Sequence, residues 1–128
     1  MSDGIQFRTF QEMIDVVAPN MPHALILDWW RRVELTLRYY TIAHHNRRSL
    51  KAEQAIRVLE VDSRFEPEVI AALHELRRTR NVVAHGQARS ITSTDAASFA
   101  GRALNLIGRI AREVPDDLAV TSGAASVA

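Results

Sequence analysis

A long segment with two apolar faces constrains the fold more than any other feature of the chain. It opens at Pro22 and continues to about His45. At about 100° per residue, its apolar residues form one face and a second face well around the helix. Because one short domain buries two faces of a single helix only with difficulty, we expect the second face to contact a partner, most commonly a second copy of the chain. The first face consists of Ile26, Trp30, Val33, Leu37 and Tyr40, and the second of Leu35, Tyr39 and Ile42.

The rest of the chain also carries apolar residues at helical spacing, and no segment alternates convincingly as a strand would. A first helix is expected to stop at Pro19, and Ser49 is expected to cap a short helix with apolar Ala52, Ala55, Ile56 and Leu59. A fourth helix covers about 66–85, and a fifth, capped by Ser93 or Thr94, reaches Val114. The sequence therefore predicts an all-α, up-and-down bundle of four or five helices.

The length of 128 residues fits one domain. Residues 1–20 are expected to form a short N-terminal helix and turn, and residues 21–114 the helical bundle. The small and featureless residues of 115–128 predict a disordered tail.

Composition narrows the class of protein. The chain is 47% hydrophobic with a formal net charge of +1, as in many soluble globular proteins. It has no cysteine, which excludes a disulfide framework, a zinc–thiolate site and a thiol nucleophile. Neither a signal-peptide pattern nor an apolar run of membrane-spanning length is present, so we expect a cytoplasmic protein with no membrane partner.

The stretch HHNRR, residues 44–48, raises the question of a metal site or a phosphate grip. Adjacent histidines point in different directions on a helix, and no tight carboxylate cluster accompanies them. We therefore interpret 44–48 as a solvated helix end and predict no metal and no cofactor.

An arginine stands on an apolar stripe of the helix at 66–85. A guanidinium there is costly unless it is paired or lines a cleft. Arg80 could extend along its stem to solvent, form a salt bridge with a buried carboxylate such as Glu34, or face a functional crevice. The stripe itself consists of Val69, Leu73, Leu76 and Val83.

The flank beside this stripe is polar. Arg77, Asn81 and His85 follow one row at i, i+4 and i+8. Arg80 and His85 lie about 140° apart on an ideal helix, but they share the helix end before Gly86. There the helix dipole favours a cation, which suits His85 to proton transfer. Alternatively, Asn81 and His85 simply bond the last carbonyls and the following loop.

The stretch RTRNVVAHG, residues 78–86, resembles the signature of the HEPN superfamily, in which Arg, a polar residue and a later His close a helix of an all-α bundle. Arg80, Asn81 and His85 match it in that order. The upstream WRRVELTLRYY and the preceding EVIAALHELRRTRN also resemble helices of this family, so that the likeness covers about residues 22–114.

The resemblance implies a metal-independent endoribonuclease, often the toxin of a toxin–antitoxin pair or a defence component, with an antitoxin protein as a possible partner. Such domains dimerise so that two Arg/His pairs meet in one cleft. His85 would act as general acid or base while an RNA 2′-hydroxyl attacks the adjacent phosphate, and Arg80 would stabilise the transition state. Asn81 would orient the phosphate or the catalytic side chains. Arg77 and Arg78 would attract RNA phosphates, and Glu34 could orient Arg80.

Two points qualify what the resemblance implies. One toxin branch of the family carries a modifiable Tyr two residues after the His, and this chain has Gln87 there. Many HEPN domains also keep the fold without nuclease activity. The alternative function is therefore a catalytically silent module that binds a nucleotide or a protein.

Overall fold

The computed structural model describes residues 7–86 and 90–116 of the chain, and in these ranges every regular element is a helix. This confirms the predicted all-α bundle. The five helices are α1 (Phe10–Asn20), α2 (Pro22–His45), α3 (Ala52–Asp62), α4 (Pro67–Ala84) and α5 (Ser93–Ala111).

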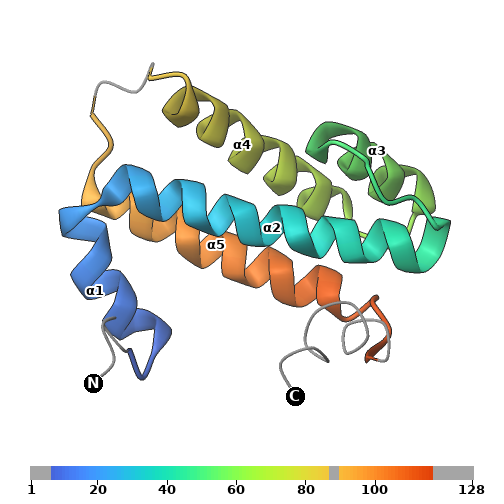
Figure 1. Cartoon of the computed structure of the whole chain (residues 1–128), viewed down its shortest axis with the longest axis horizontal. Coiled ribbons are helices and arrows are strands. Elements are labelled where there is room, and N and C mark those ends of the chain that lie inside the picture. The colour runs from blue at the N-terminus through green and yellow to red at the C-terminus, as the bar shows by residue number, and fades with distance from the viewer. Residues whose placement is uncertain (1–6, 87–89, 117–128) are drawn as a thin grey trace.

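Helix α2 forms the centre of the bundle, and its most extensive partner is α5 (Figure 1). α4 runs back along α2, whereas α3 and α5 run in the same direction as α2 (Figure 1). Residues 46–51, which form no regular element, make this possible because they return beside α2 before α3 begins. As a result, the start of α3 lies beside the middle of α2, and the two helices end together.

The first apolar face of α2 is buried in the core, as predicted. Its five residues, from Ile26 to Tyr40, are each at most 2% exposed. Small buried residues of α5, Ala96, Ala100 and Ala103, allow its backbone to approach α2 closely. Burial of this face against α5 and α4 stabilises the fold by about 25 cal/mol per Å² of apolar surface.

The second apolar face of α2 remains at the surface of the single chain. Leu35 is 46% exposed, and Tyr39 and Ile42 are half-buried. The described residues of one chain therefore leave this face without full cover, as the two-faced pattern predicts.

Helix α1 packs on α2 and α5 and contributes Ile14 and Ala18 to the common core. It ends at Asn20, one residue beyond the predicted stop at Pro19. Pro19 is tolerated in the last turn because its missing N–H leaves only one exposed carbonyl without a donor. The Asn20 side chain caps the end of the helix by donating to the carbonyl of Val16. Of the tail predicted for 115–128, residues 117–128 lie outside the described part of the chain.

Two predicted helix caps are wrong by one or two positions. Lys51 rather than Ser49 precedes α3, and its backbone N–H donates to Gln54 Oε1 at 3.0 Å. At α5 the cap is Thr92, whose Oγ1 accepts from the backbone N–H of Asp95 at 3.0 Å, while Asp95 accepts from Thr92 in return. This reciprocal pair outcompetes Ser93 and Thr94 because it satisfies two helix-end donors at once.

In the described ranges, no helix is long and apolar enough to cross a membrane.

Candidate functional site

The candidate site lies at the C-terminal end of α4, where the chain turns toward α5 (Figure 1). His85 is the cap residue, and its N–H donates to the Asn81 carbonyl at 3.1 Å. Gly86 follows with φ +69°, the left-handed conformation predicted from its position. Its N–H donates to the carbonyl of Val83 at 3.2 Å. The His85 side chain is therefore carried by a closed helix end and is exposed to solvent.

Asn81 holds the arginine of the apolar stripe. Arg80 Nη1 donates to Asn81 Oδ1 at 3.1 Å, and both side chains are partly buried. Across residues 7–86 and 90–116, no carboxylate pairs with Arg80, so it has no salt bridge with Glu34. A neutral amide thus orients this guanidinium without cancelling its charge.

The environment of Arg80 explains how the helix tolerates a cation on its stripe. Leu73 and Leu76 are at most 1% exposed and Val83 is 7% exposed. Arg80 itself keeps partial exposure. Partial exposure of this kind is expected when the stem of an arginine continues an apolar stripe and its head reaches toward solvent.

The two arginines predicted to attract phosphates have different surroundings. Arg77 Nη2 lies 3.3 Å from Glu53 Oε2, and the Glu53 carboxylate also accepts from Arg57 at 2.8 Å. Arg78 is exposed and forms no ion pair with any residue that the structure describes. Arg78 is thus available to an anion, whereas Arg77 ties α4 to α3.

Glu34 lies on α2 and is partly buried. It lines a groove of about 550 Å³ between α2 and the start of α3, together with Arg38. Glu34 and Arg38 lie one turn apart on α2 but form no ion pair in the described part of the chain. The structure therefore brings together Arg80, Asn81 and the backbone of His85, and places Glu34 in the groove between α2 and α3, where it does not bond Arg80.

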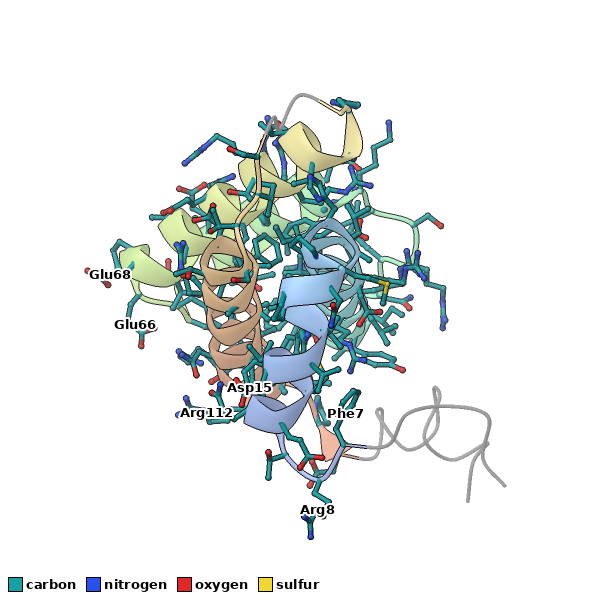
Figure 2. The ribbon with its side chains drawn as sticks, turned by 90° about the vertical axis from the view of Figure 1, so that its left-hand side faces the viewer. Phe7, Arg8, Asp15, Glu66, Glu68 and Arg112 are labelled. Carbon is teal, nitrogen blue, oxygen red and sulfur yellow. The ribbon has the colours of Figure 1, made fainter. Side chains whose placement is uncertain are left out.

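Acidic and basic side chains are unevenly distributed along α4. Glu66 and Glu68 stand at the beginning of the helix, at the opposite end from the candidate site (Figure 2). Arg109 of α5 binds Glu66, and the backbone and this arginine lower the pKa of the Glu66 carboxyl. Among the described residues of α4, the last acidic side chain is Glu75, and the turns after it carry Arg77, Arg78 and Arg80.

A second polar cluster was missed by sequence reasoning. The Tyr40 hydroxyl donates to Asp62 Oδ2 at 2.5 Å, and His45 Nε2 lies 2.8 Å from the same oxygen. His44 Nε2 donates to the carbonyl of Glu113. Residues 45–48 are exposed, as a solvated helix end requires, but the two histidines also join α2 to α3 and to the segment after α5.

Opposing effects set the protonation of this cluster. Burial acts to raise the pKa of Asp62, but the hydrogen bonds from His45 and Tyr40 together lower it below its usual range. Burial, followed by the hydrogen bond to Asp62, raises the pKa of Tyr40 well above its usual range. The pair is thus an ionised carboxylate bound to a neutral phenol. Among the described residues, no group of three His, Cys, Asp or Glu side chains could hold a metal ion.

Comparisons of the chain with protein-family models, curated protein sequences and solved structures find no match. The likeness to HEPN domains therefore stays a prediction based on residues 78–86 and on the helices before them.

Proposed function

We propose that the chain is a HEPN-like, metal-independent endoribonuclease in which Arg80, Asn81 and His85 form the catalytic group. The observation that carries this proposal is the hydrogen bond of Arg80 to a neutral amide at an accessible helix end. Because no described carboxylate pairs with Arg80, its guanidinium keeps its full positive charge. An oriented cation that keeps its charge suits the stabilisation of a phosphate-centred transition state.

The proposed reaction is an internal transesterification of RNA. The 2′-hydroxyl oxygen attacks the adjacent phosphorus and forms a P–O2′ bond, while the P–O5′ bond breaks. His85 accepts the hydroxyl proton or donates a proton to the leaving 5′-oxygen. The N–H groups of Arg80 that do not bind Asn81 donate to the non-bridging oxygens. The products are a 2′,3′-cyclic phosphate and a 5′-hydroxyl end.

We further propose that the active form is a homodimer, with the Arg80 and His85 sets of two chains sharing one cleft. The partly uncovered second face of α2, with Leu35 at 46% exposure, supports a partner of this kind. A second chain would also allow Arg80 and His85, which lie on different sides of one helix, to act on the same phosphate. The same proposal includes a role for the protein as a cytoplasmic toxin that an antitoxin protein binds.

The test compares wild type with Arg80→Ala, His85→Ala and a control, Arg112→Ala. Arg112 is exposed at the far end of the bundle (Figure 2). Each protein is incubated with RNA in EDTA, and each gene is expressed to score growth. We expect wild type and Arg112→Ala to cleave RNA and to slow growth, and the two site variants to do neither.

Equal behaviour of all four proteins, without cleavage, would remove the nuclease proposal. RNA or nucleotide binding without cleavage by wild type would instead support the catalytically silent module.

A further inference from the structure

A groove of about 550 Å³ lies between α2 and the start of α3. Its walls are the middle of α2 and the extended residues that return beside it. Three cationic side chains line it, from Arg38, Arg48 and Lys51. Glu34 is the single carboxylate among its lining residues. The groove therefore carries an excess of positive charge.

None of the three cations is engaged in an ion pair with the part of the chain that the structure describes. All three are exposed. Other arginines of the same region do have carboxylate partners, since Arg32 pairs with Asp28 and Arg57 with Glu53. Cations that converge on one hollow repel each other, and an anion placed between them removes this repulsion.

The groove adjoins the candidate site at the end of α4. Ala52 lines the groove, and its neighbour Glu53 pairs with Arg77, one helical turn before Arg80. Glu53 is bound by two arginines, so its charge is offset on the side of α3 that faces α4. Positive charge thus extends from the groove across the start of α3 to the end of α4.

We propose that this groove binds the backbone phosphates of a single RNA strand whose scissile phosphate lies at Arg80 and His85. The inference rests on the proposed function for the identity of the strand. The phosphate contacts come from Arg38, Arg48 and Lys51, and the Ser49 hydroxyl can donate to a phosphate oxygen. Such contacts give affinity without base preference and depend strongly on salt.

The experiment measures binding apart from cleavage. The probe is a fluorescein-labelled, fully 2′-O-methylated RNA strand, which keeps its phosphates and lacks the attacking hydroxyl. Anisotropy titrations over a range of salt concentrations compare wild type with the double variant Arg38→Gln/Arg48→Gln. The matched control is Arg8→Gln/Arg112→Gln, which removes the same charge from two exposed arginines outside the groove (Figure 2).

We expect the groove variant to bind the strand roughly tenfold more weakly than wild type at low salt. The logarithm of the association constant should also fall less steeply with the logarithm of the salt concentration, by about 1.4, because each of two lost phosphate contacts contributes about 0.7 to the slope. The control should bind as wild type does. Equal loss in both double variants, no loss in the groove variant, or no binding by wild type would overturn the inference. Failure of the nuclease proposal is recognised separately, because cleavage of unmodified RNA is scored with Arg80→Ala and His85→Ala.

Discussion

At the scale of single residues, the neutral partner of Arg80 is the most consequential detail. Asn81 Oδ1 accepts from the guanidinium at 3.1 Å, and an aspartate would occupy nearly the same volume. An aspartate would orient Arg80 equally well, but it would neutralise the guanidinium and repel a phosphate. Asn81 thus orients the Arg80 guanidinium, while Arg80 keeps its positive charge.

We predict that Asn81→Asp lowers the single-turnover rate of RNA cleavage by about a hundredfold, as loss of a transition-state donor commonly does. Asn81→Ala should lower it less, because Arg80 keeps its charge and loses only its orientation. Cleavage rates with labelled RNA under excess enzyme provide the measurement. A rate for Asn81→Asp equal to that of wild type would show that the charge of Arg80 is not needed.

The Asp62 cluster predicts a pH dependence of stability. Because the pKa of folded Asp62 is lowered below its unfolded value of about 3.9, the ionised carboxylate stabilises the fold above that pH. This contribution is lost as the pH falls through the lower, folded pKa. Asp62→Asn should therefore lower the free energy of unfolding by roughly 2 kcal/mol at neutral pH and by progressively less in acid.

Urea unfolding of wild type and Asp62→Asn, measured from neutral pH down into acid, provides the check. Glu60→Gln is a suitable control, because Glu60 is exposed on the same helix. A difference between wild type and Asp62→Asn that stays constant in acid would exclude the ionised carboxylate as its source.

At the scale of elements, apolar spacing predicts the helices well. It places α2 at Pro22–His45 and identifies the buried residues of α3, Ala55, Ile56 and Leu59. Capping residues are less predictable where several Ser and Thr are adjacent, as at Thr92. The bond between Tyr40 and Asp62 could not be predicted, because it depends on α2 and α3 running in the same direction.

At the candidate site, too, some features follow from local spacing and others depend on how the helices pack. Local spacing is enough to predict that Gly86 ends α4 and that Arg80, Asn81 and His85 gather at one helix end. It cannot show which side chain bonds Arg80, since Asn81 and Glu34 both offer an acceptor. The groove also escapes sequence reasoning, because the return of residues 46–51 along α2 creates it.

The α3–α4 contact yields a prediction about RNA affinity. Glu53 binds Arg77 at 3.3 Å and Arg57 at 2.8 Å, so Glu53→Gln releases two arginines and removes one negative charge. We expect this variant to bind the 2′-O-methylated strand about threefold to tenfold more tightly at low salt. Because exposed ion pairs contribute at most about 1 kcal/mol, the fold should persist.

Anisotropy titration measures this gain, with Glu60→Gln as the control for loss of an exposed carboxylate on the same helix. If both variants gain affinity equally, net charge is the cause and the position of Glu53 beside the groove has no special effect.

At the scale of the whole molecule, the second face of α2 predicts self-association. Leu35→Asp should convert a dimer into a folded monomer, because a carboxylate would be buried in the interface. Leu104→Asp is the matched control, since Leu104 of α5 is 40% exposed against 46% for Leu35. Light scattering after gel filtration gives the masses, and circular dichroism checks the fold. A wild-type monomer, or a Leu35→Asp dimer, would contradict a dimer through this face.

The proposed activity is metal-independent cleavage of RNA at the C-terminal end of α4. Mass spectrometry of RNA fragments made in EDTA by wild type and by His85→Ala tests it most directly. We expect 2′,3′-cyclic phosphate and 5′-hydroxyl ends from wild type, and intact RNA from His85→Ala. Intact RNA from both proteins, or the same fragments from both, would contradict it.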